Sequence, residues 1–336
     1  YEIYSNIKPN PTIENVQTGV AAFKKSGADY LIAIGGGSSM DTAKAIGIII
    51  ANPEFEDVRS LEGVAPTKKP CVPIIAVPTT AGTAAEVTIN YVITDVEKKR
   101  KFVCVDPHDM PIIAVVDPDM MSSMPKGLTA STGMDALTHA IEAYVSTLNG
   151  PFTDPLTLQA IEMVLEYLPA SYNGNKHARE EMHYAQCLAG MAFSNALLGI
   201  VHSMAHKTGA AFSTGHIPHG CANAIYLPYV IQYNAKDTVA ADRYAEIARR
   251  MGLEGRSRQA LINSLCAKIN EFNEKLNIPK TLKEFGINED EFKEKVDHIA
   301  ELAVGDACTG SNPRLIDPEA MAKLLTCTYY GTEVDF

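Results

Sequence analysis

The chain has 336 residues, of which 46% are hydrophobic and 21% charged, a composition typical of a globular protein and not of a disordered or fibrous one. Its formal net charge of -11 does not suit the neutralisation of nucleic-acid phosphates, and the longest apolar run is too short for a membrane span. We therefore expect neither a nucleic acid nor a membrane as a partner.

The seven cysteines lie far apart with no CxxC pair, which is typical of reduced thiols in a cytoplasmic protein. No signal peptide precedes Tyr1, and the lack of an initial Met indicates a fragment or a processed form.

The first part of the chain alternates between apolar runs of strand length and segments with helical spacing. Helices are predicted over 12–25 and 38–51, the second with Ser38 or Ser39 as its N-cap, and a helix-like stretch over 79–86. Strands are predicted over 30–34, 72–77, 89–94, 101–105 and 112–116. Strands that alternate with helices favour a parallel sheet, so residues 1–126 are expected to form an α/β domain.

The pattern changes after residue 126, where long amphipathic segments replace the strand-like runs. The predicted helices cover 131–146, 154–168, 177–198, 200–212, 238–251, 256–275, 289–303 and 317–330. Residues 127–336 are therefore expected to form an all-helical domain.

Two loops rich in small residues follow predicted strands of the first domain. Gly35-Gly-Gly-Ser38 opens a predicted helix, and Pro78-Thr-Thr-Ala-Gly-Thr83 follows the second apolar run. Glycines let the backbone approach a ligand closely, and free N–H groups at a helix start attract phosphate. Ligands of open α/β sheets bind at the carboxyl ends of strands, so the two loops together indicate a dinucleotide cleft. Each loop alone is equally typical of a tight turn.

Histidines cluster in the second domain, where seven of the nine fall between His139 and His219. Asp135 and His139 are four residues apart, as are His202 and His206, so each pair lies on one face of a helix. His219 follows in a Pro-His-Gly sequence. Either pair alone is also typical of core or surface histidines. Together they favour a divalent metal site, because one carboxylate and three imidazoles suit Fe(II), Zn(II) or a related ion.

Together these segments resemble the iron-activated (group III) alcohol dehydrogenase family along nearly the whole chain. The motifs that carry the resemblance are Gly35-Gly-Gly-Ser38 with Asp41 and Lys44, Pro78-Thr-Thr-Ala-Gly-Thr-Ala-Ala-Glu-Val87, Gly133-Met-Asp-Ala-Leu-Thr-His-Ala-Ile-Glu142, His202-Ser-Met-Ala-His206 and Pro218-His-Gly220. Residues 90–95 and 101–109 look closest to the lactaldehyde reductase (1,2-propanediol oxidoreductase) branch of that family.

The resemblance implies a dehydroquinate synthase-like architecture: an α/β nucleotide-binding domain, an all-α metal-binding domain and an active site in the cleft between them. It implies a metal, expected to be Fe(II) with Zn(II) as the alternative, on Asp135, His139, His202 and His219. It places a nicotinamide dinucleotide on residues matching Gly36, Gly37, Ser38, Thr79, Thr80, Thr83 and Lys101, and His206 beside the nicotinamide and the substrate. The family usually begins with about fifty further residues, which hold a strand–helix–strand unit and the discriminator between NAD and NADP. NAD is expected, and NADP stays open.

For one of the four ligand positions, the sequence offers two candidate histidines. The loop between His206 and His219 looks longer than in the lactaldehyde reductases, which makes His216 a rival of His219. Pro-His-Gly is the matching motif, so we favour His219.

The implied reaction is the reversible interconversion of small alcohols or diols and aldehydes. The metal would act as a Lewis acid, the nicotinamide would exchange hydride, and His206 would relay a proton. One alternative is a dehydroquinate synthase-like lyase, which needs several basic residues, whereas 127–235 hold only Lys176, Arg179 and Lys207. The other is a non-catalytic, metal-stabilised nucleotide-binding protein. The expected partners are a small alcohol or aldehyde and a second copy of the chain.

Overall fold

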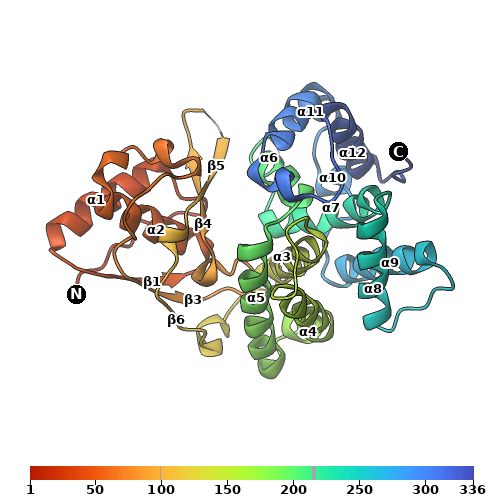
Figure 1. The fold of residues 1–336 in the computed structure, drawn as a ribbon, viewed down its shortest axis with the longest axis horizontal. Coiled ribbons are helices and arrows are strands. Elements are labelled where there is room, and N and C mark those ends of the chain that lie inside the picture. The colour runs from red at the N-terminus through yellow and green to blue at the C-terminus, as the bar shows by residue number, and fades with distance from the viewer. Residues whose placement is uncertain (99, 214–216) are drawn as a thin grey trace. The chain divides into compact units, whose positions relative to one another are not determined.

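The chain folds into two compact units, Tyr1–Met124 and Pro125–Phe336, as Figure 1 shows. The computed structural model describes residues 1–98, 100–213 and 217–336. The boundary between the units falls two residues before the one that the sequence predicts at 126.

The first unit is a mixture of strands and helices. Its elements are α1 (Ile13–Ser26), β1 (Leu31–Gly35), α2 (Gly37–Ala51), β2 (Gly63–Val64), β3 (Ile74–Pro78), β4 (Asn90–Asp95), β5 (Arg100–Val105) and β6 (Ile113–Ala114), with the short 3₁₀ helices η1 (Pro53–Phe55), η2 (Val58–Leu61), η3 (Ala85–Val87), η4 (Pro107–Asp109) and η5 (Pro118–Met121). The predicted helices 12–25 and 38–51 correspond to α1 and α2.

The strands form two sheets, not one. β1, β3 and β6 are parallel, as the sequence predicts, in the order β1-β3-β6. The second sheet has the order β2-β5-β4, and within it β4 and β5 are antiparallel, which corrects the prediction of a parallel sheet throughout. Asp95 pairs directly with Arg100, and so short a connection permits only antiparallel strands.

Helix α2 supplies the core of this unit. One part of its surface packs with α1 and the second sheet, through Val16, Ile46, Tyr91 and Phe102 among others. Another part, including Met40, packs on β1 and β3. The face of β1 and β6 that α2 does not cover is apolar and exposed to solvent. Ile32 and Ile34 are each 56% exposed, and Ile113 is 48% exposed.

Two predictions about the loops of this unit are wrong. Helix α2 begins at Gly37 with Gly36 as its N-cap and no hydrogen bond from a capping side chain, so neither Ser38 nor Ser39 caps it. The chain turns into this helix at Gly35, where φ is +150°, and a Cβ there would lie 2.3 Å from the Ser39 hydroxyl. The stretch 79–86 forms no α-helix. The backbone at Ala84 has a φ of +51°, which interrupts any helix, and only the short η3 follows.

The second unit is all-helical in its described residues, as predicted. Its elements are α3 (Lys126–Val145), α4 (Asp154–Tyr172), α5 (Lys176–Ala196), α6 (Ile200–Thr208), α7 (His219–Asn234), α8 (Thr238–Arg250), α9 (Arg258–Lys275), α10 (Leu282–Phe285), α11 (Glu289–Val304), η6 (Ala307–Ser311) and α12 (Pro318–Tyr330). Helices α3, α4 and α5 pack on one another, α3 also packs on α7, and α6 packs on α7 and α11 (Figure 1).

Among the described helices, no single one is long and apolar enough to cross a bilayer; α5 and α6 together have the length and composition for it, but they are bent by 103°.

Candidate metal centre and nucleotide loops

Helix α3 carries the first half of the candidate metal site. Asp135, His139 and Glu142 occupy positions i, i+4 and i+7, so all three lie on one face of the helix. Because α3 packs against α4, α5 and α7, this face is enclosed, and each of the three residues is only 4% exposed. Polar groups this deeply buried need partners, and the neighbouring helices supply them.

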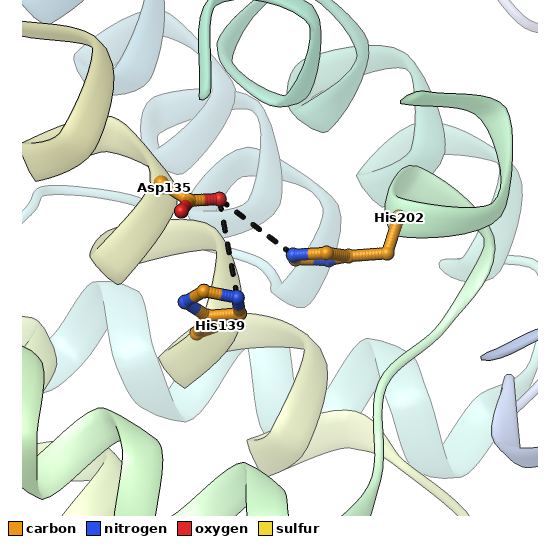
Figure 2. Close-up of side chains that lie close together, drawn as sticks. All are labelled: Asp135, His139 and His202. Carbon is orange, nitrogen blue, oxygen red and sulfur yellow. Dashed lines mark ion pairs between the residues drawn. The ribbon is translucent and has the colours of Figure 1, made fainter. Parts of the chain in front are cut away.

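Helices α6 and α7 bring the remaining imidazoles. His202 lies in the first turn of α6, and His219 is the first residue of α7. The two helices pack together, so both rings reach Asp135. Figure 2 shows His202 approaching the Asp135 carboxylate from its own helix while His139 approaches from α3.

The four predicted ligands converge on one oxygen atom. The Nε2 atom of His139 lies 3.9 Å from Asp135 Oδ1, and the Nε2 atoms of His202 and His219 each lie 3.7 Å from it. Donor atoms of Asp135, His139 and His202 all lie within 4.8 Å of one another. With metal–ligand bonds of about 2.1 Å, tetrahedral donors are about 3.4 Å apart, so the set is slightly wider than a closed site and fits a first-row divalent ion.

The charges at this site are strongly coupled. Burial alone would raise the pKa of Asp135, but the imidazoles of His139, His202 and His219 outweigh it and hold that pKa well below its usual range. Burial would lower the pKa of His202, yet Glu142 and Asp135 outweigh burial and raise it to about 9. A divalent cation bound beside Asp135 would itself supply the positive charge that otherwise comes from these imidazoles.

Two further residues complete the surroundings of the ligands. Asn223, on α7, donates through Nδ2 to Asp135 Oδ1 at 2.7 Å, and the same nitrogen lies 3.2 Å from His202 Nε2. Glu142 accepts from His202 Nδ1 at 2.5 Å. Neither residue has a role in the predictions from sequence.

His206 lies beside the candidate ligands His202 and His219. Its ring stacks on that of His219, with centroids 5.3 Å apart, and its Nδ1 is 3.2 Å from Asp306. Lys207 contacts the same carboxylate at 2.7 Å. Burial would raise the pKa of Asp306, but His206 and Lys207 outweigh it and hold that pKa far below its usual range.

His206, Asp306 and Cys308 form a second group of potential metal donors. Burial raises the pKa of the Cys308 thiol well above its usual value, and Asp306 raises it further, so the thiolate that a metal needs is disfavoured. Lys207 already neutralises Asp306. We therefore assign no metal to this group. His216, the rival of His219, lies outside the described residues.

The predicted nucleotide-binding residues lie in the first unit, on two adjacent loops and a strand. A Cβ on Gly36 would lie 3.0 Å from Thr80 Cγ2, and a Cβ on Gly37 would lie 3.0 Å from Thr83 Cγ2. The Thr80 hydroxyl is buried without a hydrogen-bond partner, as expected of a group placed to meet a ligand. Thr79 joins the first loop through its N–H, which donates to the Gly35 carbonyl at 2.9 Å.

Lys101 and Ser38 are connected through Asn10. Lys101 Nζ donates to Asn10 Oδ1 at 2.7 Å, and the Asn10 N–H donates to Ser38 Oγ at 3.3 Å. Burial lowers the pKa of Lys101 to about 8, with Asp41 opposing that shift. These contacts link the predicted nucleotide residues to one another near the start of α2.

The motif residue Lys44 has no role in the predictions from sequence, and the structure gives it one. It is fully buried and donates from Nζ to the carbonyls of Thr88 at 2.6 Å and Asn90 at 3.0 Å. Asp109 lies 3.6 Å away, where burial raises the pKa of its carboxyl to about 7 and Lys44 opposes that shift. Lys44 thereby fixes the beginning of β4 against α2.

Known proteins that are similar to this chain match it in both of its units. A family model described as "Fe-containing alcohol dehydrogenase family, C-terminal" matches residues 129–329, and one described as "Iron-containing alcohol dehydrogenase" matches residues 1–118. The chain therefore belongs to the iron-containing alcohol dehydrogenase family, whose members are oxidoreductases. This membership confirms the resemblance, the fold class and the enzyme class that the sequence predicts.

Named relatives support the assignment. An NADPH-dependent butanol dehydrogenase of Clostridium saccharobutylicum is 54% identical over 337 residues, which cover 100% of this chain and 85% of the relative. The lactaldehyde reductase of Escherichia coli (strain K12) is 53% identical over 326 residues, covering 96% and 83% of the two chains. A solved alcohol dehydrogenase from Oenococcus oeni superposes with a TM-score of 0.91 at 40% identity, covering 98% and 84%.

Proposed function

We propose that this chain interconverts small alcohols or diols and aldehydes by hydride exchange with a nicotinamide dinucleotide, as a metal-dependent enzyme. The observation that carries the proposal is the convergence of three imidazole nitrogens within 3.9 Å of one carboxylate oxygen. The names of the two relatives at 53% and 54% identity, a lactaldehyde reductase and a butanol dehydrogenase, support the substrate class.

The metal would be held by Asp135, His139, His202 and His219. Three nitrogens and one oxygen without a thiolate suit Fe(II), which we propose from the family, and Zn(II) would bind the same donors. When bound, such an ion supplies a Lewis acid that polarises the alcohol or carbonyl oxygen of the substrate. Elemental analysis of anaerobically purified protein would distinguish the two metals.

His206 is the proposed proton carrier. Asp306 accepts from its Nδ1, so Nε2 is the atom left to hold or pass on a proton. The contact between Asp306 and Lys207 keeps that carboxylate ionised and able to hold the ring in this orientation. These contacts support acid–base work by His206 and not metal binding.

The dinucleotide would lie on the two loops and Lys101. The tight packing of Gly36 and Gly37 against Thr80 and Thr83 brings the loop backbones together, and the α2 N-terminus would face the phosphates. We propose NAD as the cofactor, with NADP as the alternative that the butanol dehydrogenase relative supports by its name.

The substrates would be short and uncharged. A lyase that holds a phosphate and a carboxylate needs several cations, and in the described residues around His206 the cation that contacts the site is Lys207. We also propose a homodimer in the cytoplasm. The cysteines are all in the reduced form, which fits a reducing compartment, and sedimentation would measure the oligomeric state.

The ligand assignment is tested by three alanine variants. His202→Ala and His219→Ala should lose most bound metal and nearly all activity, while the first unit still binds nucleotide, because one lost imidazole leaves a weakly held ion. His206→Ala should keep its metal and lose about 10²- to 10⁴-fold in turnover, the usual cost of lost acid–base assistance. Metal content and the oxidation of reduced nicotinamide by small aldehydes are the two measurements.

The exposed His298 provides a control, since His298→Ala should change neither quantity. Full metal in the His202 and His219 variants would contradict the proposed ligand set. Loss of metal only in the His206 variant would contradict it as well.

A further inference from the structure

Glu142 lies directly behind His202, on the side of the ring away from Asp135. Its Oε2 accepts from His202 Nδ1 at 2.5 Å, while His202 Nε2 points to Asp135 Oδ1 at 3.7 Å. The Glu142 side chain is 4% exposed, so this contact is shielded from water. A carboxylate in such a place accepts the Nδ1 proton, which leaves the Nε2 lone pair directed at the other ligands.

The second oxygen of Glu142 holds the helix that carries His202. Its Oε1 accepts from the Val201 N–H at 2.7 Å, in the first turn of α6. That amide is one of the N–H groups that an α-helix leaves without an internal partner, and a negative charge at this end of a helix is favourable. One carboxylate thus fixes the orientation of the ring and the position of the backbone that bears it.

The chain makes room for this carboxylate at Gly199, just before α6. A Cβ on Gly199 would lie 2.9 Å from Glu142 Oε1 and 2.8 Å from Asn312 Oδ1. Such distances are shorter than carbon–oxygen contacts allow, so any larger residue would displace Glu142 together with Asn312. The glycine is required here for close approach and not for its backbone conformation.

We propose that Glu142 is a positioning residue of the metal centre, which sets His202 in the tautomer and the place from which Nε2 can bind the ion. The proposal rests on the metal site proposed above. It adds a residue outside the four ligands, on the same face of α3 as Asp135 and His139.

The pattern of donors explains why this position needs a carboxylate and not an amide. Glu142 faces two N–H donors and offers two acceptor oxygens. Glutamine would offer one oxygen and one NH₂ group. If that NH₂ faced His202, Nδ1 would become the acceptor and the proton would move to Nε2, which could then no longer bind metal. If it faced Val201, two donors would oppose each other and α6 would shift.

The test compares Glu142→Gln with the wild-type chain and with Glu162→Gln, a control on α4 whose side chain is 42% exposed. We would measure zinc affinity by competition with a chelator, and the visible spectrum of the Co(II)-loaded protein, which reports the geometry of the ligands. We expect Glu142→Gln to weaken zinc binding by about 10- to 100-fold and to change the Co(II) spectrum, with nucleotide binding unchanged. Glu162→Gln should match the wild type in all three.

Two further variants separate positioning from a merely structural role. Glu142→Asp keeps two acceptor oxygens and should restore part of the zinc affinity, whereas a simple loss of packing would make it no better than glutamine. Gly199→Ala keeps every charge but displaces Glu142, and should weaken zinc binding in the same direction. Both variants also provide the test if Glu142→Gln does not fold.

Zinc affinity within about twofold of wild type in Glu142→Gln, with an unaltered Co(II) spectrum, would overturn the assignment. Full affinity in Gly199→Ala combined with no rescue in Glu142→Asp would do the same. A wild-type chain that binds neither zinc nor cobalt would overturn the metal site itself together with this assignment, and so is distinguishable from failure of Glu142 alone.

Discussion

The Asp135 carboxylate concentrates the chemistry of the second unit in a single buried group. It is 4% exposed, its pKa is held well below its usual range, and it faces the Nε2 atoms of His139, His202 and His219 together with the Asn223 amide. An ionised carboxylate in such a place is stable only while positive charge and N–H donors surround it. The same arrangement therefore stabilises the metal-free fold and provides the donors for a cation.

Replacing Asn223 should show how these two roles are coupled. Asn223→Ala removes the 2.7 Å hydrogen bond to Asp135 and should destabilise the metal-free protein by about 1–3 kcal/mol. The cost should be smaller with zinc bound, because the ion then balances the same carboxylate. Zinc should therefore raise the melting temperature more in Asn223→Ala than in the wild type. The exposed control Asn263→Ala should follow the wild type, and equal zinc-induced shifts in all three proteins would contradict the prediction.

Gly37 provides the corresponding test in the first unit. A Cβ at this position would already lie 3.0 Å from Thr83 Cγ2, so the branched side chain of Gly37→Val would fill the space in front of the α2 N-terminus. Loss of one or two hydrogen bonds to a charged phosphate, at about 1.5–3 kcal/mol each, corresponds to at least about tenfold weaker dinucleotide binding. Metal content should not change.

The control for Gly37 is Gly127→Val, in the first turn of α3, where nothing lies within 4 Å of the added Cβ. Calorimetric titration of both variants with NAD gives the comparison. Wild-type affinity in Gly37→Val would mean that the glycine loop is only a turn.

At this scale the four candidate metal donors could be proposed from the sequence because the family's motifs lie within short segments of it. The sequence predicts no role for Glu142, although that residue shares the i, i+4, i+7 face of α3 with Asp135 and His139. This spacing is the feature of the sequence from which a role for Glu142 could have been predicted. Asp306 carries no such signal, because it reaches His206 from 100 residues away through the fold.

At the scale of elements, the hairpin β4–β5 is tied to η2 by the ion pairs of Arg59, which contacts both Asp95 and Glu97. Arg59 Nε donates to Asp95 Oδ2 at 2.8 Å, and the Asp95 side chain has no exposed surface. The hydrogen bond from Arg59 is the main reason that the pKa of Asp95 falls to about 2. Arg59 itself reaches Asp95 from the first turn of η2, so the contact joins segments 36 residues apart.

The pH dependence of stability follows from this shift. The folded pKa of about 2 lies below the unfolded value of about 3.9, so the stabilisation is present above about pH 4 and is lost as the pH falls towards 2. Arg59→Gln should therefore lower the free energy of unfolding at pH 7, and its difference from wild type should shrink between pH 5 and pH 3. Urea unfolding at several pH values measures it. Arg258→Gln, at an exposed pair, should show almost no effect, and a difference that did not vary with pH would contradict the assignment.

Elements with a clear period were predictable, and those without one were not. Helix α7 is buried on almost every side, so its sequence has no polar face and the 3.6-residue period is absent. The sequence predicts a helix over 154–168, whereas α4 continues through Pro169 to Tyr172. The prediction extended α6 to 212, whereas it ends at Thr208, before Gly209. In each case tertiary packing or a single residue overrides the local pattern.

At the scale of the whole molecule, the sheet β1-β3-β6 has an unusual outer face. Parallel sheets are normally covered on both faces. Here α2 covers one face, while on the other the register aligns Ile32, Ile75 and Ile113 in one row and Ile34 with Val77 in the next. Ile32 and Ile34 are each 56% exposed, so a continuous apolar surface is accessible to solvent. Contiguous apolar surface of this kind binds hydrophobic dyes and promotes self-association.

The 336-residue chain should therefore bind the dye ANS in its native state and associate as its concentration rises. The double variant Ile32→Thr/Ile34→Thr should lower both effects, because threonine keeps the strand propensity of isoleucine while removing most of the apolar contact area. Val239→Thr, at a single residue that is 65% exposed on α8, is the control and should leave both unchanged. Fluorescence titration and sedimentation velocity measure the two effects. An ANS signal equal in wild type and the double variant would show that the dye binds elsewhere and that this sheet face is not the apolar surface that the molecule presents to water.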